Sequence, residues 1–197
     1  MVSYLLFVTF IYRNKIKLNK EVGENMTEHV KGNELERKAR ELLTERGVTI
    51  DDMAELVFYL QSSYHPNLTL ETCKENVERV LKKREVQNAI ITGVQLDKLA
   101  EQNKLEQPLQ KTIETDEGLY GIDEVIALSI VNVYGSIGFT NYGYIDKQKP
   151  GILARLNDQS TGEVHTFLDD IVGAIAAAAS SRLAHMMADE EMKHQDD

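Results

Sequence analysis

Apolar residues recur with a helical period through most of this chain. The first amphipathic segment begins after Asn33 and stops at Gly47, a residue type that commonly ends helices. Its apolar stripe consists of Leu35, Ala39, Leu42 and Leu43. Because these positions repeat every three to four residues, they predict a helix with one buried face.

Two threonines mark where the next helices begin. Thr49 precedes Asp51 and Asp52, so a side-chain acceptor and two carboxylates lie where the first backbone N–H groups of a helix are unpaired. Thr69 stands in the same relation to a third amphipathic segment, which ends near Leu81. Both segments are therefore predicted to be helices capped at their first turn.

The fold class follows from these segments and from the ones after them. A fourth helix is predicted over about 85–102, where Gly93 allows a close helix crossing. Residues 173–181 are nearly all small, which suits a central helix with others packed closely around it. No stretch alternates between apolar and polar for long enough to predict a strand. We therefore predict an all-α fold, a compact bundle of about six or more helices around one central Ala-rich helix, with residues 134–144 as a connector.

The two ends of the chain are predicted to lie outside this bundle. Residues 1–33 read as an N-terminal tail, and residues 20–22 can be encoded as a ribosome-binding sequence, so translation could instead start at Met26. The alternative is a tail that touches a membrane surface. A single helical domain is expected over 34–187, and the polar residues 188–197 are expected to be disordered.

Charge and composition narrow the function. Asp and Glu number 32 against 22 Lys and Arg, so the net charge of −10 repels nucleic-acid phosphates and no nucleic-acid partner is expected. The single cysteine, Cys73, permits no internal disulfide and fits a reducing cytoplasm. The uncharged run 171–181 is too short to cross a bilayer, so no transmembrane span is expected. We expect a cytoplasmic protein whose contact with a membrane would be peripheral.

Acidic residues gather at two places in the middle of the second half. Asp123 and Glu124 open an apolar helical stretch, where carboxylates can also simply complement the helix dipole. Further along, Asp146 stands with Lys147 and Lys149 in a segment that is equally typical of a solvated turn. Lysines bind phosphate as point charges, so this second segment also suits a phosphate contact.

A second acidic pair, Asp169 and Asp170, lies in the most apolar surroundings. Leu168 precedes the pair and Ile171 follows it. Two like charges in such a neighbourhood repel and lose hydration, so they need counter-charges, hydrogen bonds or a cation. His165, close to the same helix start, is a secondary candidate for a proton donor or phosphate contact.

Acidic groups from three helices would supply the hard oxygen ligands that Mg²⁺ accepts, with room left for water and phosphate oxygens. The cation would neutralise charge on a phosphoryl group and orient it. We predict metal ligation by Asp123, Glu124, Asp169 and Asp170, phosphate binding by Lys147 and Lys149, and catalytic roles for Asp123, Asp146, Asp169 and Asp170.

Three motifs, GIDEVIALSI, YIDKQKPGIL and TFLDDIVGAIAAA, resemble in this order those of the phosphatidylglycerophosphatase A family, and in particular its soluble bacterial branch. The resemblance implies a six-helix domain and Mg²⁺-dependent removal of the terminal phosphate from phosphatidylglycerophosphate or a related ester. The front half departs from the membrane-bound members. Residues 49–103 are polar and charged where those members carry a Gly- and Pro-rich motif and lipid-embedded helices.

Two other functions fit the same residues. One is a non-catalytic module of that family that binds a metal or phosphate, or that forms a homo-oligomer through its early helices. The other is a purely structural bundle in which the acids only cap helices. Under the leading hypothesis the partners are a phosphate ester, which includes a phospholipid at the membrane surface, and Mg²⁺.

Overall fold

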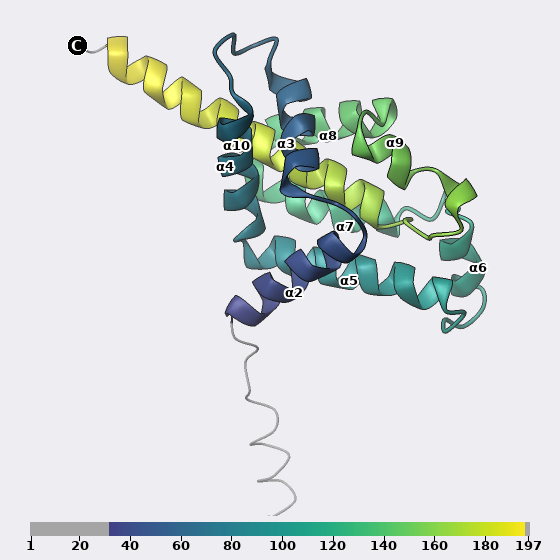
Figure 1. The fold of residues 1–197 in the computed structure, drawn as a ribbon. Coiled ribbons are helices and arrows are strands. Elements are labelled where there is room, and N and C mark those ends of the chain that lie inside the picture. Colours follow the sequence, from purple (N-terminus) through teal and green to yellow (C-terminus); the bar gives the residue numbers. More distant parts are fainter. Residues whose placement is uncertain (1–31, 196–197) are drawn as a thin grey trace, which may run out of the picture. The chain divides into compact units, whose positions relative to one another are not determined.

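All regular structure in residues 32–195, the part of the chain that the computed structural model describes, is helical (Figure 1). The predicted all-α class is therefore confirmed for this range. The predictions for residues 1–31, including a start at Met26, lie outside the described residues. In chain order the elements are α2 (Gly32–Glu45), α3 (Ile50–Gln61), α4 (Leu70–Leu81), α5 (Arg84–Glu101), α6 (Leu109–Glu114), α7 (Ile122–Val131), the 3₁₀ turn η1 (Asn132–Tyr134), α8 (Ser136–Gln148), α9 (Ile152–Leu156), the 3₁₀ turn η2 (Gln159–Thr161) and α10 (Leu168–Gln195).

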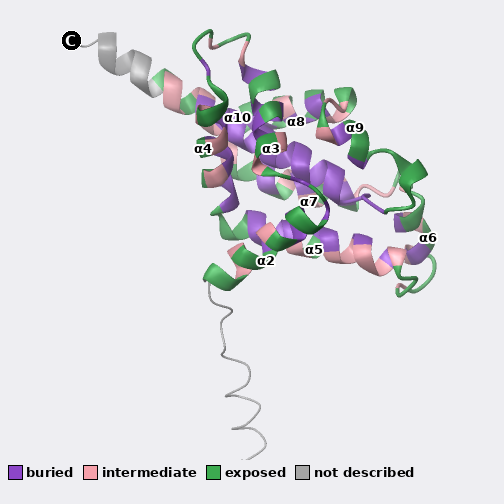
Figure 2. Ribbon diagram, in the orientation of Figure 1, coloured by how far each residue is buried: buried purple, intermediate pink, exposed green. Residues whose placement is uncertain are grey.

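The Ala-rich helix α10 is the axis of the bundle. It packs against α3, α4, α5, α7, α8 and α9 (Figure 1). Every residue from 164 to 181 is buried, and the corresponding ribbon is purple throughout in Figure 2. A helix that is covered on all sides needs small residues where backbones approach, which is why residues 173–181 are mostly alanine. The predicted central helix is confirmed.

The same helix also has the length and composition of a membrane span. Leu168–Ala188 has a mean hydropathy of 1.3, but 67% of its apolar stretch is buried inside the bundle. The core helix of a folded bundle has this composition because it is apolar on every side. Length and composition therefore do not make α10 a span.

The predicted helix starts are found where the threonines placed them. Thr49 Oγ1 accepts from the backbone N–H of Asp52 at 3.1 Å, and the Asp52 carboxylate accepts from the backbone N–H of Thr49 at 2.8 Å. Thr69 Oγ1 accepts from the backbone N–H of Thr72 at 3.2 Å. Each cap stabilises its helix by about 1 kcal/mol, so α3 and α4 begin where the sequence alone directs them.

The structure departs from the sequence predictions in two places. Residues 134–144, predicted as a connector, are largely helical, because packing of α8 on α10 outweighs the low helix propensity of their glycines. Gly138 also lets α8 approach the end of α7 closely, since a Cβ there would lie 3.0 Å from Val131 Cγ1. Helix α10 also continues through 188–195, where a disordered tail was expected, because these residues extend a helix already formed.

Helices α5 and α10 cross closely at the start of α10. A Cβ built on Gly93 would lie 2.5 Å from Ile171 Cδ1 and 2.8 Å from Phe167 Cβ. Only glycine lets the two helices approach this far, so the close crossing that the sequence allowed is present. This crossing fixes the position of the first turn of α10, which carries Asp169 and Asp170.

Candidate active site

Two helix starts bring three carboxylates together. Asp123 and Glu124 lie in the first turn of α7, and Asp170 lies in the first turn of α10. One carboxylate oxygen from each of the three lies within 4.8 Å of the others. Glu124 Oε2 is buried and accepts no hydrogen bond from the described residues. A set of oxygen atoms at this spacing, one of them without a donor, fits a divalent cation such as Mg²⁺.

Burial makes this concentration of negative charge costly. It raises the pKa of Asp123 to about 7, and the neighbouring Glu124 adds to the effect. Burial also raises the pKa of Asp170 to about 8, with the charge of Asp169 as the next cause. Because the carboxylates hold protons more strongly than in water, they favour either protonation or a bound cation.

A lysine supplies positive charge beside the three carboxylates. Lys149 Nζ lies 2.7 Å from Asp146 Oδ1, 2.7 Å from Asp169 Oδ2 and 3.5 Å from Asp170 Oδ1. Burial lowers the pKa of Lys149, but the negative charges of Asp169 and Asp146 raise it by more, so the net shift of the pKa is upward. Lys149 adopts a left-handed conformation with φ of 44° at the end of α8. A glycine would adopt that backbone with less strain, which indicates that the side chain is needed there.

The structure brings most of the predicted site residues to one place but divides their roles. Asp169 faces Lys149 and is not one of the three clustered carboxylates, although the sequence paired it with Asp170. Asp146 is also outside the group of three, and its carboxylate pairs with Lys149. Lys147 is exposed on α8 and makes no ion pair with a described residue.

Tyr142 is a site residue that the sequence did not reveal. It is 6% exposed, and its hydroxyl is buried without a hydrogen-bond partner among the described residues. Burial raises the pKa of Tyr142, and the charge of Asp170 is the next cause, which places the hydroxyl near the site. Tyr142 lies one turn before Asp146 on α8, a spacing that could have identified it had residues 134–144 been predicted as a helix.

Asp97 positions the first turn of α10. It is fully buried on α5, and its two carboxylate oxygens accept from the backbone N–H groups of Phe167 and Leu168, both at 3.1 Å. Those N–H groups are among the ones that a helix start leaves unpaired. The sequence carried a signal, since Asp97 continues the apolar stripe of Ile90 and Val94. A carboxylate on a buried stripe indicates a specific partner.

Replacing Asp97 by Asn is expected to destabilise the fold and displace the site. The amide has one oxygen for two N–H groups and turns a donor toward one of them, so we expect a loss of about 1–3 kcal/mol in the free energy of unfolding. Urea denaturation measures this loss. The exposed Glu75→Gln on α4 is the control and should leave the midpoint unchanged. An unchanged midpoint in Asp97→Asn would contradict the capping role.

The fold and the site together define a class of protein: an all-helical bundle with buried carboxylates at two converging helix starts. The sequence profile of the family described as Phosphatidylglycerophosphatase A matches residues 41–185. The chain belongs to that family. The match includes α7, α8, α9 and the first part of α10, which contain the three motifs that predicted the family.

Relatives share nearly the whole domain. The chain is 69% identical over 160 residues to uncharacterized protein YutG of Bacillus subtilis, covering 81% of this chain and 96% of that protein. A solved structure of a protein of unknown function from Bacillus stearothermophilus is 74% identical, with a TM-score of 0.76 over 77% of this chain and 94% of that one. The low temperature requirement C protein from Listeria monocytogenes is 70% identical, with a TM-score of 0.77 over 78% and 97% of the two chains.

Proposed function

We propose that this protein is a Mg²⁺-dependent phosphatase that removes the terminal phosphate from phosphatidylglycerophosphate or a related phosphate ester. Family membership supports the reaction class. The observation that carries the proposal is the gathering of Asp123, Glu124 and Asp170 within 4.8 Å of one another in a largely buried place. A merely structural bundle gains nothing from three mutually repelling carboxylates, since one acid is enough for a helix start.

Asp123, Glu124 and Asp170 would hold the cation. Mg²⁺ bound there would neutralise charge on the phosphoryl group and orient it for displacement. Asp146 and Asp169 hold Lys149 beside the carboxylates, so its ammonium group is fixed where phosphate oxygens would lie. Lys147, exposed on the same helix, would meet a phosphate at the outer edge of the site.

Exposed apolar side chains flank the acidic pair of α7 in the sequence. Leu119 is 94% exposed just before α7, and Ile122 and Val125 on α7 are 47% and 58% exposed. They flank Asp123 and Glu124. Apolar side chains next to a site for charged groups suit a substrate that has both an acyl part and a phosphate. We infer a cytoplasmic protein that meets its lipid substrate at the membrane surface.

A phosphate-release assay tests the proposal. The full chain is incubated with phosphatidylglycerophosphate in mixed micelles, and with soluble phosphate esters, in Mg²⁺ or in excess chelator. We expect release from the lipid that requires Mg²⁺ and returns when the cation is restored. Binding of Mg²⁺ by calorimetry without turnover of any ester would instead favour a non-catalytic module. The absence of both would leave a structural bundle.

A further inference from the structure

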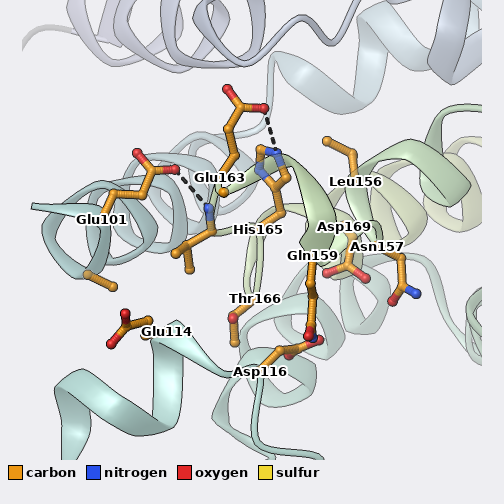
Figure 3. Close-up of a pocket in the computed structure, with 13 residues that line it drawn as sticks. Glu101, Glu114, Asp116, Leu156, Asn157, Gln159, Glu163, His165, Thr166 and Asp169 are labelled. Atoms are coloured by element: carbon orange, nitrogen blue, oxygen red, sulfur yellow. Dashed lines mark hydrogen bonds and ion pairs between the residues drawn. The ribbon is translucent and has the colours of Figure 1, made fainter.

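A pocket of about 230 Å³ opens beside Asp169 (Figure 3). It lies among the end of α5, the residues after α6 and the loop that leads into α10. The residues that define its chemistry are the acids Glu101, Glu114, Asp116, Glu163 and Asp169, with His165 and Asn157 on the wall. It is smaller than the roughly 300–1,000 Å³ of pockets for drug-sized ligands. The space therefore suits a short polar group and not an acyl chain.

The pocket adjoins the carboxylate site at Asp169. Asp169 lines the pocket, and its Oδ2 lies 2.7 Å from Lys149 Nζ. Asp116, which also lines the pocket, interacts electrostatically with Asp169, with Lys149 and with Glu124. A phosphate ester whose phosphate lies at the carboxylate site would thus place the adjoining carbons of its alcohol in this pocket.

His165 lines the pocket and carries a polar atom without a partner among the described residues. The residue is 6% exposed, and its Nε2 lies 3.3 Å from Glu163 Oε2. Its Nδ1 is buried and has no hydrogen-bond partner among the described residues. A neutral imidazole that donates from Nε2 to Glu163 has an acceptor at Nδ1, and a buried acceptor without a donor is costly. A ligand hydroxyl would supply that donor once the ring turned Nδ1 toward the pocket.

The charges on the wall select against phosphate and favour hydroxyl groups. None of the described residues that line the pocket is Lys or Arg. Glu101 is neutralised by Arg46, 2.5 Å away, and also accepts from the backbone N–H of Val164 at 2.9 Å. The remaining wall combines acceptors, such as Asp116 and His165, with the amide donor of Asn157. A hydroxyl both donates and accepts, whereas an ammonium group only donates.

We propose that this pocket binds the hydroxyl-bearing alcohol part of the phosphate ester, and that His165 and Asp116 determine a preference for polyhydroxyl alcohols. The inference rests on the proposed function, because it takes the carboxylate site as the place of the phosphate. The pocket adds recognition of the group that remains after phosphate leaves. A site built to pair a substrate hydroxyl rejects the analogue that lacks it, because its own polar groups are then left unpaired.

A binding experiment tests the pocket without turnover. Glycerol 3-phosphate and propyl phosphate share a phosphate and a three-carbon chain, and only the first has free hydroxyls. In Mg²⁺, NMR titration of the full chain should shift the imidazole signals of His165, assigned with His165→Asn, on addition of glycerol 3-phosphate. Propyl phosphate and inorganic phosphate should leave those signals in place. Equal shifts with the three ligands, or none with glycerol 3-phosphate, would overturn the proposal.

A kinetic experiment separates the pocket from the phosphatase itself. Wild type should turn over phosphatidylglycerophosphate with a kcat/KM at least about tenfold above that of its analogue without the free glycerol hydroxyl. His165→Leu should lower kcat/KM for phosphatidylglycerophosphate more than for the analogue and so remove that preference, whereas the exposed Glu75→Gln on α4 should leave the preference unchanged. Equal losses on the two substrates would show a merely structural role. If wild type releases no phosphate from either substrate, the proposed function fails, and the NMR titration alone decides the pocket.

Discussion

Replacing Asp170 by Asn is expected to abolish Mg²⁺-dependent phosphate release, with a loss of at least about a hundredfold in kcat. Asp170 is the residue through which α10 joins the two acids of α7, so its charge completes the group of three oxygens. The amide keeps the size of the side chain and removes the charge that a cation requires. Phosphate release and Mg²⁺ calorimetry on the same preparation measure the effect.

The same substitution is expected to stabilise the metal-free protein at pH 8. The pKa of Asp170 is raised from an ordinary value of 3.8 to about 8 in the folded state. Between these values the folded state binds more protons than the unfolded state, so stability falls as the pH rises from about 4 to about 8. Asn carries no charge and escapes that loss.

Thermal unfolding in excess chelator at pH 5 and pH 8 distinguishes the two forms. Between these pH values the unfolding midpoint temperature should fall more for the wild type than for Asp170→Asn. Saturating Mg²⁺ should restore the midpoint temperature of the wild type alone. Glu75→Gln, exposed on α4, is the matched control for both activity and stability. Full turnover in Asp170→Asn, or a pH dependence identical to that of the wild type, would remove Asp170 from the site.

Replacing Lys149 by Met is expected to destabilise the metal-free protein by about 2 kcal/mol, less than the 3–5 kcal/mol of a fully buried ion pair. The Lys149 side chain is 24% exposed, so water screens part of the interaction. Its removal leaves Asp146, Asp169 and Asp170 without their shared counter-charge. Methionine keeps the apolar length of the side chain and the strained backbone, so the change reports the charge.

Mg²⁺ should restore much of the stability that Lys149→Met loses, because a cation bound only by the folded state compensates the same carboxylates. Urea denaturation with and without Mg²⁺ measures this rescue. Lys147→Met is the control for stability, since this exposed neighbour should change the free energy of unfolding by no more than about 0.5 kcal/mol. A loss in Lys149→Met that is the same with and without Mg²⁺ would separate the lysine from the cation site.

The early helices were predictable because their signals are local. A cap such as Thr49 acts on backbone atoms three residues away, and a stripe such as Leu42 and Leu43 repeats within one helix. The central helix was predictable for a different reason, since a run of small residues without a polar face can only be covered on all sides. Residues 134–144 misled the prediction because their helix depends on packing against α10.

The sequence by itself determined the all-helical class, the central helix, the family and the acids from which a metal site could be made. Only the tertiary structure decided the separate roles of Asp169 and Asp170: Asp169 makes the closer ion pair with Lys149, and Asp170 joins the acids of α7. It also revealed the capping of α10 by Asp97 and the pocket beside His165. Those features join residues far apart in the chain, and distance between side chains depends on how helices cross and not on local periodicity.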